Sequence, residues 1–343
     1  MTIAGAAPSG NFEVRIHTAI DDIGPEWDDL MVVARAPVFY RRPFLRAFEK
    51  YPLHAVRRTA YILLHDGSGA AVAGLPAYLQ RGVDPMRVVT DHFPSAQGQL
   101  ALFSHVWHCY DTVLPVAPGR EDAAPAALEA LRWVATDWGA RLYGLANVDA
   151  AGSLDPLLAH AGLNSADIDI GWGLSLPAFD GYEHYLAALR SKPRRNLRRD
   201  LRAADRAGVT AYWEHPRDAD LDGFVALARA TAAKFDNSDY YQPGLFQDFV
   251  LSLGGDAQCL ELRLGNQLIS SGLALTDDTR FHFWACGFAP MDGFSGFYLA
   301  FDQMLRRAFE SGSQWVELGR RNPVFKRRYG LTPRTLRAWI AKT

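Results

Sequence analysis

Two stretches in the second half of the sequence concentrate charged side chains. From Arg190 to Arg206 the sequence reads RSKPRRNLRRDLRAADR, with eight basic and two acidic residues. From Arg320 to Arg328 five of nine residues are basic, within the segment ELGRRNPVFKRRYG. Arginine presents a planar fork that pairs with phosphate, and lysine is a compact positive charge. Both stretches therefore indicate contacts with a polyanionic ligand, or with negative charge that develops during a reaction.

The first stretch has the period of an amphipathic helix. Leu197, Leu201 and Ala204 fall on one apolar stripe, Pro193 suits a first turn and Gly208 suits a C-cap. The arginine face of this helix is our candidate for binding tRNA or another phosphate ligand. The alternative is a solvated face whose arginine stems lie on the core. The candidate residues are Arg194, Arg195, Arg198, Arg199 and Arg202.

The second stretch follows a predicted strand that ends near Leu318. A turn that contains proline comes next, and loops at strand ends are where functional sites are often built. We therefore expect this segment to line the active site. The candidates for substrate binding are Arg320, Arg321 and Arg328 from the segment itself, with Trp284 and Ser295 from earlier in the chain.

The charge is unevenly distributed. Residues 184–343 contain 23 Lys and Arg against 17 Asp and Glu, a net charge of +6, whereas residues 1–183 contain 13 against 21, a net charge of −8. A positive second half favours an anionic partner. A basic surface that is only solvated is the alternative.

The elements that must position these side chains appear twice. Residues 59–65 with 70–79, and 257–264 with 268–276, each read as two strands around a turn. Each pair is followed by an amphipathic helix, a glycine stop at Gly139 or Gly312, and a short strand. The sequence therefore predicts an α/β protein made by internal duplication, with lobes at residues 12–165 and 166–343.

Several classes of site and location are excluded or disfavoured. The sequence has no apolar run long enough for a membrane helix, no secretory signal, and three cysteines without CxxC spacing, which favours a cytoplasmic protein. His105 and His108 lack a second cluster of ligands, so we expect no metal site. The phosphate-loop, dinucleotide and nucleophile-elbow motifs are also missing.

The two basic stretches, the hairpin between them and residues 294–312 occur in the order seen in Fem-type transferases. The sequence resembles that family and the allied GNAT-like acyltransferases over roughly residues 35–340. The resemblance implies two GNAT-like lobes, each a mixed sheet flanked by helices. It also implies formation of an amide bond: Fem-type enzymes transfer an amino acid from aminoacyl-tRNA to a peptidoglycan precursor, and relatives in secondary metabolism use small amines. The lysine of the family's Phe-Lys-Arg motif, which contacts substrate, matches Lys326.

The sequence leaves open which molecule donates the acyl group. Enzymes of the GNAT superfamily that use coenzyme A have an Arg/Gln-x-x-Gly-x-Gly/Ala loop that binds pyrophosphate. The matching segment here, MDGFSG at 291–296, lacks that spacing. We therefore expect aminoacyl-tRNA as co-substrate, an amine of a small molecule or of a peptidoglycan-type precursor as acceptor, and no bound cofactor. An acyl-CoA donor is the first alternative, and a non-catalytic RNA-binding protein is the second. The oligomeric state is not predicted.

Amide formation needs a neutral amine, a polarised carbonyl and a protonated leaving group. We predict that a backbone N–H near Gly287 polarises the carbonyl, and that Glu317 or Asp111 accepts the amine proton. Tyr298 is the candidate for protonating the leaving group, and Lys326 for neutralising negative charge.

Overall fold

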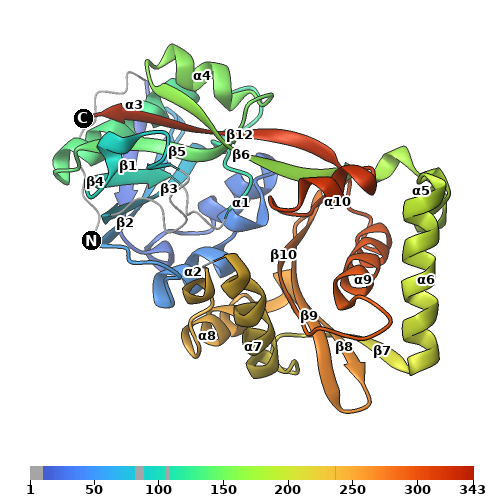
Figure 1. Ribbon diagram of the computed structural model, residues 1–343. Coiled ribbons are helices and arrows are strands. Elements are labelled where there is room, and N and C mark those ends of the chain that lie inside the picture. Colours follow the sequence, from blue (N-terminus) through green and yellow to red (C-terminus); the bar gives the residue numbers. More distant parts are fainter. Residues whose placement is uncertain (1–10, 82–88, 105–108, 236) are drawn as a thin grey trace. The chain divides into compact units, whose positions relative to one another are not determined.

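The computed structural model describes residues 11–81, 89–104, 109–235 and 237–343. These residues form two compact units (Figure 1). The first unit runs to Ile170 and includes Arg334–Thr343, and the second is Gly171–Pro333. Within the described residues, no helix is both long and apolar enough to cross a bilayer.

The first unit is a mixed sheet with helices on both faces. Its strand order is β1-β2-β3-β4-β5-β12, with β4 and β5 parallel and the other neighbours antiparallel. The strands are β1 (Glu13–His17), β2 (Arg58–His65), β3 (Ala71–Arg81), β4 (Leu100–Ser104), β5 (Leu142–Asp149) and β12 (Thr332–Lys342). The helices are α1 (Glu26–Val33), α2 (Arg42–Lys50), α3 (Ala123–Asp137) and α4 (Leu154–His160).

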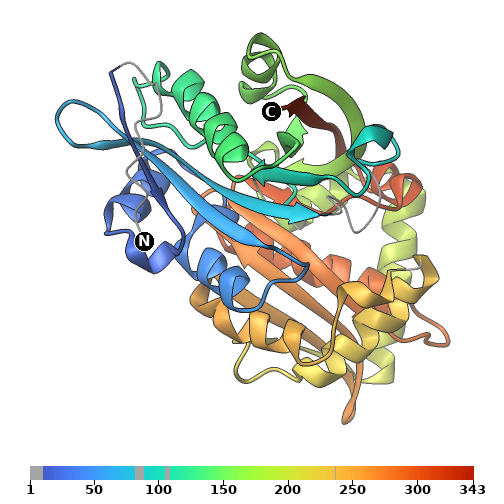
Figure 2. The same ribbon diagram turned by 90° about the vertical axis from the view of Figure 1, so that its left-hand side faces the viewer.

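The residues of β2 explain why this sheet is covered on both faces. Ile62 belongs to the cluster that packs α3 on the sheet, while the ring of Tyr61 meets Trp27 of α1 edge to face, with centroids 5.5 Å apart. A strand that is buried on both faces reads as a continuous apolar run rather than an alternating one. Figure 2 shows α3 on one side of the β2–β3 ribbon and the blue helices α1 and α2 on the other.

The second unit repeats this plan. Its sheet has the order β6-β11-β10-β9-β8-β7, with β10 and β11 parallel. The strands are β6 (Asn164–Ser175), which begins in the first unit, β7 (Val209–Glu214), β8 (Ala257–Leu264), β9 (Gln267–Thr276), β10 (Arg280–Phe288) and β11 (Trp315–Glu317). The helices are α5 (Tyr182–Ala188), α6 (Ser191–Ala207), α7 (Leu221–Ala232), α8 (Leu245–Ser252), α9 (Gly296–Glu310) and α10 (Pro323–Arg328).

The expected duplication of elements is confirmed. In each unit a hairpin and a third antiparallel strand lead into a long helix, and the strand after the helix pairs parallel to the third strand. These series are β2–β3–β4–α3–β5 and β8–β9–β10–α9–β11. Within the second unit, Figure 1 shows α9 and α6 on one side of the sheet, and α7 and α8 on the other.

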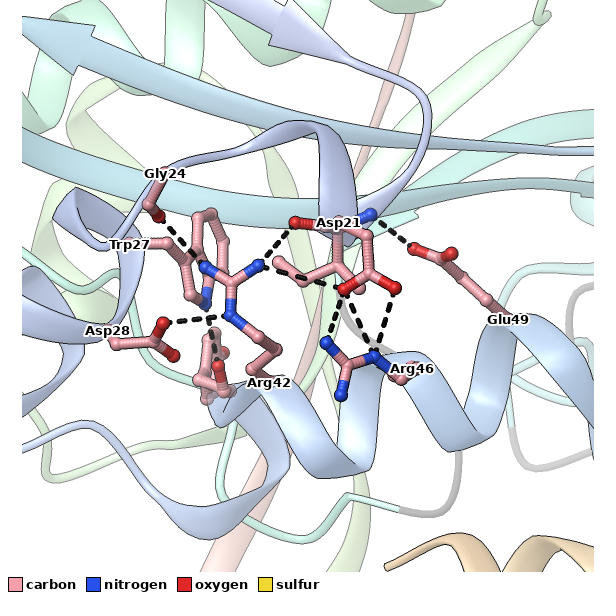
Figure 3. A network of polar contacts seen from close by, with 9 residues as sticks. Asp21, Gly24, Trp27, Asp28, Arg42, Arg46 and Glu49 are labelled. Carbon is pink, nitrogen blue, oxygen red and sulfur yellow. Dashed lines mark hydrogen bonds and ion pairs between the residues drawn. The ribbon is translucent and has the colours of Figure 1, made fainter.

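A half-buried arginine of α2 joins this helix to α1 and to the segment before α1 (Figure 3). Arg42 Nε donates to Asp28 at 2.8 Å, while its terminal nitrogens donate to the carbonyl oxygens of Ile20 at 2.6 Å and Gly24 at 2.9 Å. Its side chain is only 16% exposed. We expect Arg42→Ala to lower the free energy of unfolding by about 2–3 kcal/mol, because two carbonyl groups and a carboxylate lose a charged donor. Urea denaturation measures this change.

Arg46 provides the matched control on the same helix. It pairs with Asp21, and both side chains are more than half exposed, at 54% and 58%. Solvent screens such a pair, so Arg46→Ala should change the free energy of unfolding by less than about 1 kcal/mol. Equal effects of the two substitutions would contradict the role given to Arg42.

Candidate active site

A cavity of about 710 Å³ opens within the second unit. It lies between β10, the first turn of α9, and the segment that runs from the end of β11 through α10. Ligand sites of small molecules commonly have volumes of roughly 300–1,000 Å³. Of the sequence-predicted candidates, the structure brings seven together around this cavity: Trp284, Ser295, Tyr298, Arg320, Arg321, Lys326 and Arg328.

The first turn of α9 borders the cavity. Ser295 is the N-cap, and its hydroxyl accepts a hydrogen bond from the backbone N–H of Tyr298 at 3.5 Å. Ser295, Phe297 and Tyr298 all line the cavity. The unpaired N–H groups at the start of a helix favour negative charge, so this end of the cavity suits an anionic group of a ligand.

Four cationic side chains form what we call the basic wall: Arg320, Arg321, Lys326 and Arg328. Arg320 and Lys326 are buried, at 9% and 6% exposure, whereas Arg321 and Arg328 are exposed. The described residues that line the cavity include no aspartate and no glutamate. Cationic side chains therefore predominate in the described lining, which favours an anionic ligand.

Two members of the basic wall, Lys326 and Arg328, lie on the short helix α10, where the sequence predicted a turn. Asn322 adopts the left-handed conformation with φ of 64°, and its carbonyl accepts the N–H of Lys326 at 3.1 Å. Pro323 then occupies the first turn, where a missing N–H is harmless. This geometry directs Lys326 into the cavity, while the guanidinium of Arg327 lies over the ring of Trp172, 5.6 Å from its centroid.

An aromatic cluster fixes α10 against α9. The ring of Phe325 packs on Phe297, Tyr298, Phe301 and Tyr329, with centroid distances of 4.8, 5.5, 5.0 and 4.5 Å. Such contacts add to the free energy of simple burial. The position of Lys326, next along the chain, is therefore set by a packed core rather than by a loop.

Tyr329 connects this cluster to α5 and α6. Burial and, after it, the neighbouring phenol of Tyr298 raise the pKa of Tyr329, so its hydroxyl stays protonated. That hydroxyl donates to the carbonyl of Pro193 at 3.4 Å, and the carbonyl of Tyr329 accepts from Tyr185 at 2.8 Å. Tyr298, half-buried at the cavity, thus lies beside a protonated phenol.

Glu317 and Gly287 lie near the cavity without lining it. Glu317 is 1% exposed, and its carboxylate accepts a hydrogen bond from the indole of Trp315 at 3.4 Å. A Cβ atom added to Gly287 would lie 2.2 Å from the backbone nitrogen of Ala228 in α7, so this glycine permits close packing of α7 on β10. The carbonyl of Gly287 accepts from the hydroxyl of Ser270 at 3.1 Å.

Asp111 lies in the first unit and does not line this cavity. Its carboxylate accepts a hydrogen bond from Arg334 at 3.0 Å, and the same guanidinium lies 3.4 Å from a carboxylate oxygen of Asp149. These contacts join the segment before α3 to β5 and β12. They give Asp111 a structural role in its own unit.

Part of the lining was not predicted from the sequence. Tyr241, Phe288 and Phe297 contribute rings, and Cys286 is half-buried at the cavity. Burial raises the pKa of the Cys286 thiol to about 11, and the positive charge of Lys326 acts in the opposite direction. Cys286 therefore stays a neutral thiol near pH 7.

The expected amphipathic helix is confirmed as α6, and most of its candidate arginines are exposed. Leu197 and Ala204 are buried, and Gly208 ends the helix with φ of 81°. Arg194 is half-buried and donates to the carbonyl of Ala187 at 2.6 Å. The exposed arginines of the candidate set are Arg195, Arg198, Arg199 and Arg202.

Among the described residues, no cluster of three or more His, Cys, Asp and Glu side chains could hold a metal ion. His105 and His108 lie outside the described residues.

Residues 191–327 match the family described as an acetyltransferase (GNAT) domain. The matched region includes α6, the strands β7 to β11, α9 and most of α10, and therefore most of the residues around the cavity. This match supports an acyltransferase. No curated protein matches the sequence.

Solved structures show the fold of the whole chain. FemX superposes with a TM-score of 0.65 at 11% identity, over 92% of this chain and 96% of that one. A tandem GNAT protein from the clavulanic acid biosynthesis pathway superposes with a TM-score of 0.56 at 16% sequence identity, over 96% of this chain and 98% of that one. The C-terminal domain of a putative lysylphosphatidylglycerol synthetase from Agrobacterium fabrum superposes with a TM-score of 0.58 at 14% identity, over 92% of this chain and 90% of that one. The chain thus consists of two tandem GNAT-like lobes, as the sequence resemblance implied.

Proposed function

We propose that this protein is an N-acyltransferase that forms an amide bond in the cavity of the second unit, with aminoacyl-tRNA as its donor. The observation that carries the proposal is the basic wall beside the first turn of α9, in a domain of the GNAT family. A small-molecule amine or a precursor of the peptidoglycan type is the acceptor.

In the proposed reaction, the neutral amine attacks the ester carbonyl of the donor. The new C–N bond forms, the bond between the carbonyl carbon and the tRNA oxygen breaks, and the amine proton leaves to water. Tyr298 donates the proton that the leaving oxygen takes up, and regains one from solvent. Lys326 stabilises the negative charge on the carbonyl oxygen. Glu317 lies outside the lining, so a role for it as proton acceptor requires an intervening water.

Two observations favour tRNA over coenzyme A. The segment before α9 lacks the glycine spacing of the pyrophosphate loop. The exposed arginine face of α6 belongs to a half of the chain with a net charge of +6, and phosphate contacts dominate the affinity of nucleic-acid binding. FemX and the putative lysylphosphatidylglycerol synthetase domain share the fold, as does the tandem GNAT protein of secondary metabolism.

An acyl-CoA donor is the second candidate. The start of α9 borders the cavity, and the GNAT domain that matches residues 191–327 is described as an acetyltransferase. A helix N-terminus binds pyrophosphate readily. The first experiment therefore titrates the protein with a charged tRNA pool and with acetyl-CoA. If the protein binds acetyl-CoA and does not bind tRNA, the donor is an acyl-CoA and not aminoacyl-tRNA.

Charge reversal on α6 tests the tRNA surface. We expect the triple variant Arg195→Glu, Arg199→Glu, Arg202→Glu to weaken tRNA binding by about 10- to 100-fold at low salt, because three phosphate contacts are lost. The slope of log K against log[salt] should become shallower by about 2. Fluorescence anisotropy with labelled tRNA measures both quantities.

The control reverses three exposed arginines of the first unit, Arg57, Arg132 and Arg141. It changes the net charge by the same amount, so a general electrostatic effect would appear in both variants. Equal loss of affinity in the two would show that α6 is not a specific surface.

A further inference from the structure

One side of the cavity is an aromatic wall supported from behind. Trp284 of β10 is 5% exposed, and its ring stacks on Phe246 with centroids 6.2 Å apart and an interplanar angle of 12°. Phe249 packs on the same ring at 5.8 Å. Phe246 and Phe249 are fully buried in α8. The ring of Trp284 is therefore fixed before any ligand binds.

Tyr241 extends this wall. It comes from the segment between α7 and α8, lines the cavity, and packs edge to face on Phe246 with centroids 4.9 Å apart. Its backbone carbonyl accepts a hydrogen bond from Arg229 at 3.0 Å, which holds the segment on α7. Tyr241 and Trp284 thus share one supporting ring, and both line the cavity.

The charges around the cavity restrict what this surface can bind. The basic wall supplies four cationic side chains, and no carboxylate occurs among the described lining residues. A lysyl or arginyl side chain brought into the cavity would lose hydration without gaining an anionic partner. A carboxylate side chain would pair with the basic wall instead of the rings. An uncharged apolar side chain incurs neither penalty, and aromatic rings pack well against Trp and Tyr.

We propose that the wall of Tyr241 and Trp284 binds the side chain of the transferred group, and that this side chain is large, uncharged and apolar, with an aromatic ring preferred. The proposal rests on the function proposed above and adds the class of the transferred group. The basic wall then holds the anionic carrier, and the cavity volume of about 710 Å³ leaves room for an acceptor.

The test uses one tRNA sequence acylated in turn with phenylalanine, alanine or lysine, so that only the side chain differs. A parallel series uses phenylacetyl-CoA and acetyl-CoA. One of the two series should bind. In the tRNA series, we expect the phenylalanyl donor to bind with about 100-fold higher affinity than the alanyl donor; in the coenzyme A series, we expect the same ratio between phenylacetyl-CoA and acetyl-CoA. The lysyl donor should bind no better than the alanyl one.

Variants of the wall then assign the preference to these residues. Trp284→Ala and Tyr241→Ala should each reduce the preference for the phenyl group to about tenfold or less, while affinity for the alanyl or acetyl donor changes less than about threefold. Trp284→Phe should retain most of the preference. Tyr212→Ala, which removes an exposed ring of β7 that does not line the cavity, should leave it unchanged. Because Tyr241 is only half-buried, its variant remains informative if Trp284→Ala fails to fold.

The outcomes separate the two proposals. Binding of donors without a preference for the phenyl group, or with a preference for lysine, would overturn this inference and leave the proposed function standing. A preference that survives both alanine substitutions would also overturn it. Failure to bind either class of donor would overturn the proposed function and the inference with it.

Discussion

Lys326→Ala should lower kcat/KM for amide formation by about 10³-fold, the scale observed when one stabiliser of a developing oxyanion is removed. Lys326 is 6% exposed and lines the cavity from α10, whose position is set by the packing of Phe325. A buried cation at this place acts on charge in the transition state more strongly than one in water would. Steady-state kinetics with the donor that binds measures the effect.

The neighbouring residue supplies the control. Arg327 carries the same charge on the same helix but lies over Trp172 and outside the cavity lining. Arg327→Ala should therefore retain activity within about threefold. Lys326→Met keeps the apolar stem and removes the charge, so it should be as inactive as Lys326→Ala. Full activity of either Lys326 variant would remove this residue from the mechanism.

Gly287→Ala should destabilise the protein by about 3 kcal/mol, at the upper end of the range for overpacked cores. The added Cβ would lie 2.2 Å from the nitrogen of Ala228 and 2.3 Å from the carbonyl carbon of Leu227. These are backbone atoms of α7, so relief requires the whole helix to move away from β10. Chemical denaturation, followed by intrinsic fluorescence, measures the change.

Gly255 is the matched control in the same unit, because an added Cβ there would meet nothing within 4 Å. Gly255→Ala should leave stability unchanged within about 0.5 kcal/mol. A stable Gly287→Ala variant would show that α7 and β10 do not pack closely at this position.

Local sequence patterns were sufficient to predict the helices and strands that have a strong hydrophobic periodicity or residues typical of a helix or strand end. The arginine helix was expected from a stripe that begins near Pro193 and stops at Gly208, and α6 spans Ser191–Ala207. The strands expected at residues 257–264 and 268–276 are β8 and β9, which span Ala257–Leu264 and Gln267–Thr276. These segments are long enough for periodicity to separate helix from strand.

Very short helices, and contacts between residues far apart in the sequence, could not be predicted from local sequence patterns. The helix α10 has six residues, too few to show a period, and its N-cap Asn322 has a left-handed conformation that few residues other than glycine adopt. Asp111 was expected to act on the amine proton, and its pairing with Arg334 depends on a contact across most of the chain. The rings of Tyr241 and Phe297 line the cavity because of tertiary packing, which residue spacing in the sequence does not predict.

The sheet of the first unit includes β12, so this sheet is complete only after the second unit has been synthesised. Residues Leu336–Lys342 pair with β5, whose strand ends at Asp149, and the entire second unit is encoded between them. At about 5–20 residues per second, a ribosome needs on the order of tens of seconds to pass from one to the other. During that interval the nascent chain has an unpaired edge at β5, a surface that invites pairing with other chains. A ribosome that stalls within the second unit would therefore release a product that lacks a strand of its first sheet.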